Sequence, residues 1–402
     1  MLTAIIMAGG SGERFWPLST SERPKQLLKI FSDKTMIRET VDRILPIIEA
    51  ENIFIATNII QAKEIEKELS DIPRENLIIE PAFKDTAAAI GYSSLIIENR
   101  FKNRLKDGEK LEIVVLASDH LIKEEEEFRK VILIAAKEAT ENGMIVTLGI
   151  KPDKPETGYG YIEVKDDEIE LNSICKVKRF REKPSQELAE SYLASGKYLW
   201  NSGMFIFTTD TIFKNFEVLM EEHSTIFKEM KREFKENLTG EELSSKVKKY
   251  FDKFEKISID FGIMEYSKNI RVIPVDIGWN DIGSFNAFDE IFEKDENGNV
   301  VRGKEIRELD SKNNIVISDD LNISLLGIEN LVIVKKDKEL LITKKTKIQD
   351  IYDESKQNYG APKITKELCK SGEIISERTV GKYYRLWCSM HSNDMQTKWI
   401  QN

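Results

Sequence analysis

The chain opens with a short apolar run that ends in glycines, Leu2-Thr3-Ala4-Ile5-Ile6-Met7-Ala8-Gly9-Gly10-Ser11-Gly12-Glu13-Arg14. A strand that runs directly into such a loop lets backbone N–H groups approach a phosphate closely. Arg14 adds a charged fork for phosphate oxygens, and Lys25 follows in Pro24-Lys25-Gln26 as a second cation. The loop has neither the G-x-G-x-x-G spacing of a dinucleotide site nor the G-K-[ST] of a P-loop. It therefore predicts phosphate binding of another kind, and a plain tight turn is the alternative interpretation.

Strand-like and helix-like segments alternate through the first 150 residues. The apolar patterns predict strands at 2–7, 53–56, 77–79, 112–117 and 144–148, and helices at 35–45, 61–69, 86–99 and 128–140. Continuously apolar strands such as 113–116 are typical of strands buried on both faces. The alternation predicts an α/β, Rossmann-like domain with a mixed, mainly parallel sheet covered by helices.

Beyond residue 150 the pattern loosens. It predicts strands at 157–164, 174–180 and 270–275 and mainly helical structure over 212–254. A turn-rich segment at 294–299 precedes short β-like pieces at 314–317, 323–326, 331–335 and 339–343. We therefore expect one α/β domain over 1–293, a small β domain over 294–350, and a tail over 351–402.

Composition narrows the class of protein. The 402 residues are 41% hydrophobic and 32% charged, with 60 basic and 70 acidic side chains and a net charge of −10. This balance indicates a globular protein and argues against broad nucleic-acid binding. Neither an apolar stretch long enough for a membrane helix nor an export signal is visible, and the three cysteines form no metal or disulfide pattern. We expect a cytoplasmic protein that does not enter membranes.

Further motifs follow the opening loop in order along the chain. They are Trp16-Pro17-Leu18-Ser19, Glu80-Pro81, Asp85-Thr86-Ala87, Ala117-Ser118-Asp119-His120, Thr157-Gly158-Tyr159-Gly160-Tyr161-Ile162, Phe180-Arg181-Glu182-Lys183-Pro184, Trp200-Asn201-Ser202-Gly203-Met204-Phe205, Ser258-Ile259-Asp260 and Gly278-Trp279-Asn280-Asp281-Ile282-Gly283. This series resembles the sugar nucleotidylyltransferases over most of residues 1–346. The Trp-Pro-Leu-Ser and Pro-Lys-Gln variants resemble the bacterial mannose-1-phosphate guanylyltransferases in particular.

The resemblance implies a reaction and a set of site residues. It implies a nucleotidyltransferase domain that transfers GMP from GTP to mannose 1-phosphate with Mg²⁺, and a small β domain that relatives build as a left-handed β-helix. The implied catalytic residues are Arg14, Lys25, Asp119 and Asp281, the last two as the metal ligands. The implied nucleotide-binding residues are Ala8, Gly9, Gly10, Gly12, Glu80, Thr86 and Ala87. The implied sugar-phosphate contacts are Gly158, Glu182, Lys183 and Asn201.

The residues alone leave several of these roles open. Asp119 follows a buried strand, where ligands bind in open α/β sheets, but an aspartate there also caps helices. Asp281 has turn chemistry, and spacing cannot pair it with Asp119. Asp85 stands where relatives carry asparagine. Another nucleotide and hexose 1-phosphate pair, or an inactive nucleotide-sugar-binding regulatory protein, are the alternative functions, and a homodimer is compatible with the sequence.

The tail carries a different resemblance. Residues 352–364 and 376–382 resemble the helix-turn-helix segment near the start of insertion-sequence transposase subunits, with helices predicted at 364–368 and 378–386 around Gly372. The carboxylate-bearing transposase domain does not follow. We expect the tail to be a gene-fusion remnant without functional nucleic-acid binding.

Overall fold

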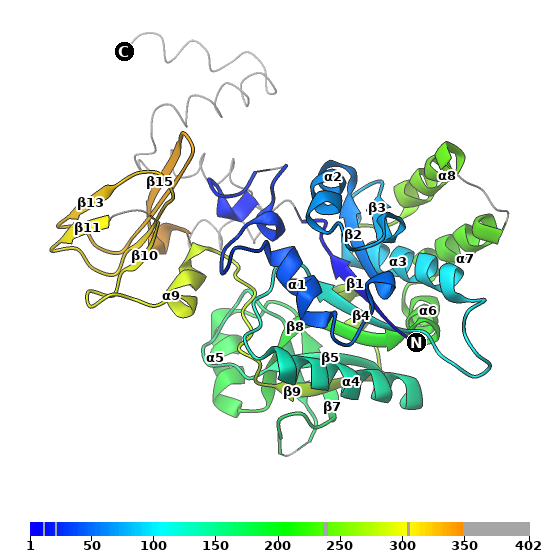
Figure 1. The fold of residues 1–402 in the computed structure, drawn as a ribbon. Coiled ribbons are helices and arrows are strands. Elements are labelled where there is room, and N and C mark those ends of the chain that lie inside the picture. Colours follow the sequence, from blue (N-terminus) through cyan, green and yellow to red (C-terminus); the bar gives the residue numbers. More distant parts are fainter. Residues whose placement is uncertain (11–12, 21, 167, 236–239, 304–305, 349–402) are drawn as a thin grey trace, which may run out of the picture. The chain divides into compact units, whose positions relative to one another are not determined.

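The computed structural model describes residues 1–10, 13–20, 22–166, 168–235, 240–303 and 306–348. The chain forms two compact units (Figure 1). The first unit contains Met1–Gly10 and Lys29–Asp281, and the second contains Ser11–Leu28 and the chain from Ile282. None of the helices in the described part combines the length and apolarity that crossing a bilayer requires.

The first unit is built on one sheet of nine strands in the order β3-β2-β1-β4-β8-β5-β9-β7-β6. Its first four strands are parallel neighbours, which confirms the α/β alternation predicted for this part of the chain. These strands are β1 (Leu2–Met7), β2 (Ile53–Asn58), β3 (Leu77–Glu80) and β4 (Glu112–Ala117).

The second half of the sheet is mostly antiparallel. Only β5 and β9 pair in parallel there, while β8 runs antiparallel to β4, β5 and β6, and β7 runs antiparallel to β6 and β9. Because β6 pairs back onto β8, these five strands close into a ring. The sheet is therefore mixed, as predicted, but not mainly parallel. Its strands are β5 (Ile145–Ile150), β6 (Tyr161–Val164), β7 (Cys175–Arg181), β8 (Tyr198–Thr208) and β9 (Ile270–Val275).

Strand β8 joins the two halves of the sheet, and the sequence pattern did not predict it. Most residues of β8 are buried, as expected for a strand in the middle of a sheet. Its middle, however, reads Asn201-Ser202-Gly203, a sequence that is typical of turns. Gly203 has φ 69°, and the register between β5 and β8 shifts beside it. An irregularity within a strand thus produced the turn signal. Helix α5 (Gln186–Ser195), which precedes β8, was also missed.

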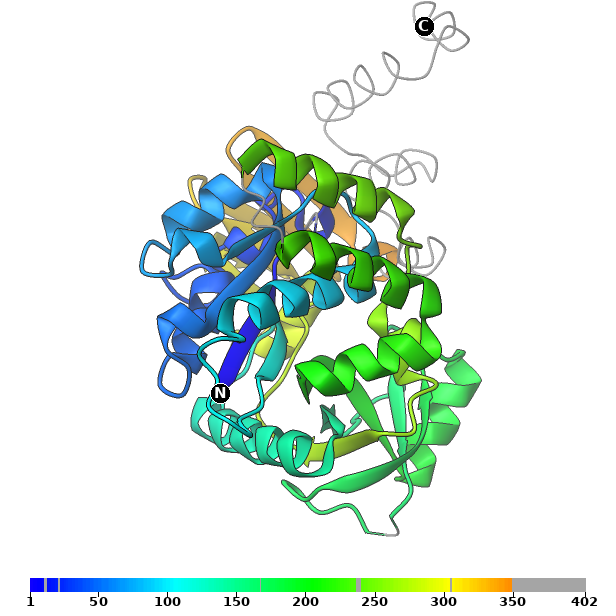
Figure 2. The same ribbon diagram turned by 90° about the vertical axis from the view of Figure 1, so that its right-hand side faces the viewer.

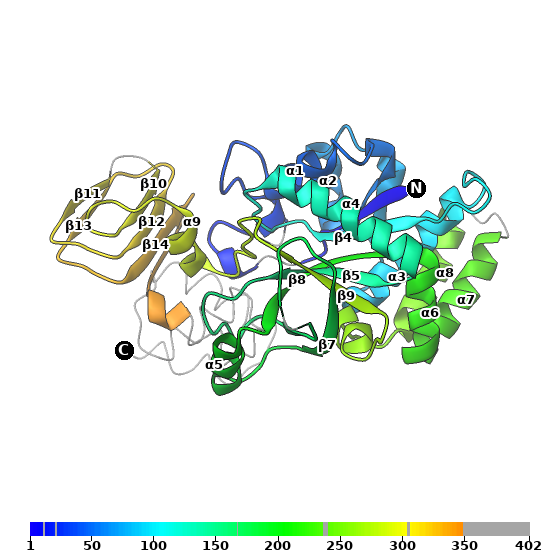
Figure 3. The ribbon, with the colours of Figure 1, turned by 90° about the horizontal axis from the view of Figure 1, so that it is seen from below.

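Helices cover both faces of the sheet. On one face, Ile5, Phe54 and Ile113 share a core with Ile90 and Leu95 of α3. Helix α4 contacts β4, β5, β8 and β9 and lies along the sheet with α1 (Figure 3). The helices of this part are α1 (Met36–Ile44), α2 (Ile59–Glu68), α3 (Asp85–Phe101) and α4 (Glu125–Asn142).

A layer of three further helices packs next to α3 (Figure 2). They are α6 (Thr209–Leu219), α7 (Glu221–Lys235) and α8 (Gly240–Lys253), and they occupy the predicted helical segment at 212–254, except that α6 begins before it. The approach of α7 to α3 depends on a glycine. A Cβ added to Gly91 would lie 2.2 Å from the Phe227 ring, so only glycine permits this contact.

The second unit contains a short stack of β coils (Figure 3). β12 pairs in parallel with both β10 and β14, and β11 pairs in parallel with β13. β15 pairs antiparallel with β14. Asparagines support the stack, since Asn299 Oδ1 accepts from Asn314 N and Asn314 Oδ1 accepts from Leu331 N. The elements are α9 (Phe288–Ile291), β10 (Val300–Gly303), β11 (Ile306–Leu309), β12 (Ile315–Ser318), β13 (Ile323–Leu326), β14 (Leu331–Lys336) and β15 (Glu339–Lys344).

The second unit also holds most of the opening signature, because Ser11–Leu28 groups with the chain from Ile282. Phe15 is buried against Phe285 and Phe288, with ring centroids 5.0 and 5.9 Å away. Phe292 continues the cluster at 5.0 Å from Phe288. This apolar packing fixes the backbone that carries Arg14 and Lys25.

Candidate functional site

The topology of the first unit marks one edge of its sheet as a candidate ligand-binding edge. The chain moves outward from β1 to β2 and β3, then returns to place β4 on the other side of β1. In open α/β sheets, ligands bind outside the carboxyl ends of the strands at such a switch point. Gly9 follows β1, Glu80 ends β3 and Asp119 follows β4, so three residues predicted from the sequence lie along this edge.

The glycine loop after β1 is held from its carbonyl side. Thr57 Oγ1 donates to the Ala8 carbonyl, Asn58 Nδ2 to that of Gly9, and Gln61 Nε2 to that of Gly10. A Cβ added to Gly10 would meet nothing within 4 Å. The loop is thus shaped by β2 and α2, with open space at Gly10. Gly12 lies outside the described residues.

Glu80 is a buried carboxylate that faces this loop. A Cβ added to Gly9 would lie 3.5 Å from Glu80 Oε1. Burial, and then the negative charge of Asp85, raise the pKa of Glu80 to about 7. Near neutral pH, Glu80 is therefore present in both its protonated and its ionised form. Among the described residues around Glu80, no cation offsets the negative charge of the ionised form.

Thr86 and Ala87 anchor the start of α3. Thr86 Oγ1 accepts from Ile259 N at 2.9 Å, and Ala87 N donates to Ile257 O at 3.3 Å. Asp85 has φ 68°, and its side chain accepts from Thr86 N. Both predicted nucleotide contacts thus tie α3 to the segment around Asp260, so a structural role is visible for them alongside the predicted one.

The segments that carry Asp119 and Asp281 lie side by side. Leu121 and Asn280 form an antiparallel bridge, with N–H···O distances of 2.9 and 3.1 Å. One residue away on each segment, Trp279 Nε1 donates to His120 Nδ1 at 3.1 Å. His120 therefore accepts a hydrogen bond from an indole, which fixes the direction of its ring. The fold thus brings together two segments that spacing alone could not pair.

The four predicted sugar-phosphate residues also converge, because β6, β7 and β8 pair at their ends. Asn201 N donates to Gly160 O, and Lys183 N donates to Tyr159 O, so the segment after Gly158 is held from both neighbours. A Cβ added to Gly160 would lie 2.1 Å from Glu182 Oε2. The backbone at Gly160 therefore lies directly against the Glu182 carboxylate.

Two further carboxylates, those of Asp260 and Glu265, contact this cluster. Asn201 Nδ2 donates to Asp260 Oδ1 at 2.9 Å, and Glu182 N donates to Glu265 Oε1 at 3.3 Å. Burial first, and the Asp260 charge second, raise the pKa of Glu182 to about 8, while burial raises that of Asp260 to about 6. Glu182 Oε2 is buried without a hydrogen-bond partner in the described surroundings. A neutral carboxyl at Glu182 could donate to a hydroxyl of a ligand.

The two predicted cations Arg14 and Lys25 belong to the second unit. Lys25 is buried, and its Nζ lies 5.6 Å from the centroid of the Phe15 ring. Arg14 is exposed and lies in a short 3₁₀ turn, Glu13–Phe15. Both side chains are therefore placed by the loop that packs on Phe285 and Phe288.

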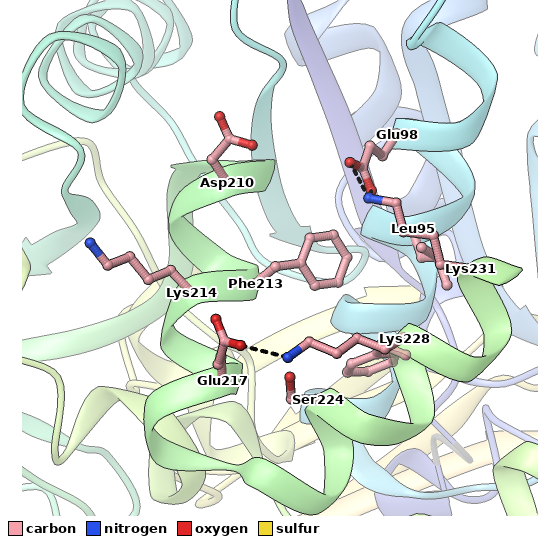
Figure 4. Close-up of a pocket in the computed structure, with 10 residues that line it drawn as sticks. Leu95, Glu98, Asp210, Phe213, Lys214, Glu217, Ser224, Lys228 and Lys231 are labelled. Carbon is pink, nitrogen blue, oxygen red and sulfur yellow. Dashed lines mark hydrogen bonds and ion pairs between the residues drawn. The ribbon is translucent and has the colours of Figure 1, made fainter.

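A separate hollow of about 420 Å³ lies between α3, α6 and α7 (Figure 4). It contains none of the predicted site residues. Lys231 pairs with Glu98 and Lys228 pairs with Glu217 across it, and the Phe213 side chain also lines it. Because opposite charges pair across the gap, we interpret it as a groove between packed helices.

Three residues close to the predicted site residues, Asp260, Tyr159 and Trp279, were not themselves predicted as site residues. Asp260 opens a π-helical turn, Asp260–Met264, a conformation that often accompanies functional sites. The Tyr159 hydroxyl donates to Asp281 Oδ1 at 2.7 Å, and Trp279 binds His120. All three stand inside motifs quoted from the sequence, so motif membership was the available signal, while their partners were set by the fold.

Family models match most of the chain. A model described as "Nucleotidyl transferase" matches residues 3–298, and a "MannoseP isomerase/GMP-like beta-helix domain" matches 303–353. An "HTH-like domain" matches 336–386, in agreement with the resemblance of the tail. The helices predicted at 364–368 and 378–386 lie outside the described residues.

Individual proteins are similar over nearly the same span. A mannose-1-phosphate guanylyltransferase of Salmonella montevideo is 34% identical over 87% of this chain and 72% of its own length. The mannose-1-phosphate guanylyltransferase 2 of Escherichia coli O157:H7 is 33% identical over 98% of this chain and 78% of its own. A Thermus thermophilus structure, described as a mannose-1-phosphate geranyltransferase, is 30% identical with a TM-score of 0.75, and covers 89% of this chain and 98% of its own. The chain therefore belongs to the mannose-1-phosphate guanylyltransferase family of nucleotidyl transferases.

Proposed function

We propose that this protein transfers GMP from GTP to mannose 1-phosphate, giving GDP-mannose and pyrophosphate. The observation that carries the proposal is the convergence of Glu182, Asn201 and Asp260 in one cluster, with Asp281 hydrogen-bonded to the neighbouring Tyr159. This cluster is acidic or neutral, which suits the hydroxyls of a hexose. The relatives named above support mannose 1-phosphate as that hexose.

Glu80 supports guanine as the base. The Watson–Crick edge of guanine presents two neighbouring donors, N1–H and N2–H₂, and an ionised carboxylate offers two acceptors at matching separation. Glu80 is buried beside the glycine loop, so it would meet a base whose phosphates bind near that loop. Thymine and uracil offer one donor at N3–H between two carbonyls, and a buried carboxylate would repel those oxygens.

The residues present fit Mg²⁺. Asp119 and Asp281 lie on adjoining segments and offer hard oxygen ligands. No three His, Cys, Asp or Glu side chains of the described residues converge into a protein cage. Mg²⁺ is commonly held by one or two carboxylates together with substrate phosphates and water. When bound, the ion would neutralise phosphate charge as pyrophosphate departs.

The protein's own residues have positioning and charge-stabilising roles in the proposed reaction. An oxygen of mannose 1-phosphate attacks the α-phosphorus of GTP in line, and the bond to pyrophosphate breaks. A phosphate monoester is already ionised at neutral pH, so the nucleophile requires no general base. Arg14 and Lys25 would stabilise charge on the transferring phosphates, and Lys183 would bind the sugar phosphate.

Substrate choice is tested with a panel of nucleoside triphosphates and hexose 1-phosphates, with pyrophosphate release as the measurement. We expect GTP with mannose 1-phosphate to give the highest kcat/KM. A preference for another pair would replace the proposed substrates. Binding of nucleotide sugars without any release would indicate a regulatory protein instead.

The assignment of guanine is tested with Glu80→Gln. We expect KM for GTP to rise, because glutamine replaces one acceptor with a donor. In the wild type, only ionised Glu80 binds guanine, so KM for GTP should fall as pH rises through about 7. That dependence should vanish in the variant and persist in the exposed control Glu51→Gln. An unchanged KM in Glu80→Gln would exclude this contact.

A further inference from the structure

Tyr159 makes a contact to which the reaction outlined above assigns no role. Its hydroxyl donates to Asp281 Oδ1 at 2.7 Å, a short distance for a hydrogen bond to a carboxylate. Asp281 is bonded on one side to Asn280, whose backbone pairs with Leu121, and on the other to Ile282, which has φ 50°. A positive φ at a β-branched residue is rare, so the backbone here is held by its surroundings.

The ring of Tyr159 is itself fixed. It lies edge-on between Trp200 and Trp279, with centroids 5.1 and 5.3 Å away. Its carbonyl accepts from Lys183 N at 3.2 Å. The hydroxyl therefore has little freedom to leave Asp281, and the same residue contacts the backbone of a predicted sugar-phosphate ligand.

A hydrogen bond to one oxygen of a carboxylate fixes the direction of the other oxygen. Metal-binding carboxylates usually have such partners, and losing one typically weakens metal binding by about 10–100-fold. We propose that Tyr159 is a positioning residue that orients the Asp281 carboxylate for a divalent cation and links it to the sugar-phosphate side of the site. This inference rests on the proposed role of Asp281 as a metal ligand.

The test uses the full chain and Mn²⁺ as the probe, with free Mn²⁺ measured by electron paramagnetic resonance. GDP-mannose, the proposed product, is present throughout, and a protein-free sample corrects for its own Mn²⁺ binding. The variants are Tyr159→Phe, which removes only the hydroxyl, and Asp281→Asn, which removes the proposed ligand. Tyr192→Phe is the matched control, because Tyr192 stacks on Tyr198 in the same aromatic cluster.

We expect Tyr159→Phe to bind Mn²⁺ at least ~10-fold more weakly than wild type, with Tyr192→Phe unchanged and Asp281→Asn without detectable binding. The Mg²⁺ concentration for half-maximal turnover should rise by the same factor in Tyr159→Phe. Wild-type affinity in Tyr159→Phe, with binding lost in Asp281→Asn, would overturn the role of Tyr159 alone. Mn²⁺ binding retained in Asp281→Asn, or absent in wild type, would overturn the proposed metal site itself.

Discussion

Each unit contains a cluster of aromatic rings. The rings of one cluster have polar atoms that form hydrogen bonds, whereas the rings of the other have none. In the first unit, Tyr159, Trp279 and His120 form hydrogen bonds at their polar edges, and one of these bonds reaches Asp281. In the second unit, Phe15, Phe285 and Phe288 are hydrocarbon only, and they are fully buried. The hydrogen bonds of the first cluster fix the direction of a carboxylate, whereas the apolar packing of the second fixes the backbone that carries Lys25. The two clusters should therefore fail in different ways when altered.

The largest effect is expected at the carboxylates beside the polar cluster. Asp119→Ala and Asp281→Ala should each lower turnover by at least ~10³-fold, because a metal ligand and its charge stabilisation are lost. Both variants should remain folded, since no core packing is removed. Because one ion is shared, the double variant should be little worse than either single one. Pyrophosphate release as a function of Mg²⁺ is the measurement. Full activity in EDTA, or losses that multiply in the double variant, would contradict a shared site.

A smaller loss is expected at the lysine above the apolar cluster. Lys25→Ala should lower kcat by about 10²-fold, since a charge contact to the transferring phosphates disappears. Lys25 is buried over Phe15, so Lys25→Met separates charge from packing by keeping most of the stem. The two variants should lose similar activity, while exposed Lys29→Ala should lose none. Near-normal kcat in folded Lys25→Met would remove the lysine from the mechanism.

Within the apolar cluster, the expected effect is on stability first. Phe285→Ala should lower the free energy of unfolding by about 3–5 kcal/mol, because a buried ring is replaced by a cavity. Turnover should fall by roughly tenfold, because the loop that carries Lys25 loses the packing that positions it. Phe83→Ala is the control, since Phe83 is 64% exposed. Urea unfolding and initial rates on the same preparations test both parts. A stability loss with unchanged turnover would show that the cluster does not position the loop.

The acidic cluster of the first unit should make stability depend on pH. The folded state holds a proton on Glu182 up to about pH 8, whereas the unfolded chain releases it near its ordinary value of 4.5. Stability should therefore fall as pH rises through this window and level off above it. Glu182→Gln imitates the protonated form, so its melting temperature should fall less between pH 5 and pH 8. Parallel melting curves for the two proteins would contradict the raised pKa of Glu182.

The smallest effect is expected from removing the tail. A chain stopped after Ile348 keeps β15, buried Ile348 and the ion pair between Lys345 and Asp289. We expect its turnover to stay within about twofold of the full chain, because every described contact of the second unit is retained. A folded but inactive truncated protein would show that the tail contributes to the site.

Much of the first half of the fold follows from local patterns, because parallel strands and covering helices have distinct periods. Strand β8 does not, since its pairing with β4, β5 and β6 is set by residues far away in sequence. Its Asn201-Ser202-Gly203 reads locally as a turn. The prediction for residues 157–160 is wrong in the opposite way, because a strand was predicted there but β6 begins only at Tyr161. Local chemistry thus described these residues but not their partners.

The site shows the same limit. The sequence could place Asp119 at the end of a buried strand, because an apolar run precedes it. It could not pair Asp119 with Asp281, since the bridge between Leu121 and Asn280 joins residues about 160 positions apart. Nor does any pattern indicate that Ser11–Leu28 groups with the chain from Ile282. The roles of the individual predicted residues, and the domain limits at 293 and 350, stay predictions.

The reversed direction of β15 determines where the stack of coils can stop. A parallel coil presents its neighbour with a row of N–H and C=O groups, so a bare coil is a template on which another chain can add. β15 pairs with β14 along Leu331–Lys336, after a tight turn in which Asp337 has φ 51°. Because β15 runs the other way, it covers that row without continuing the coil. The parallel stacking of coils on this side of the second unit thus ends at one hairpin.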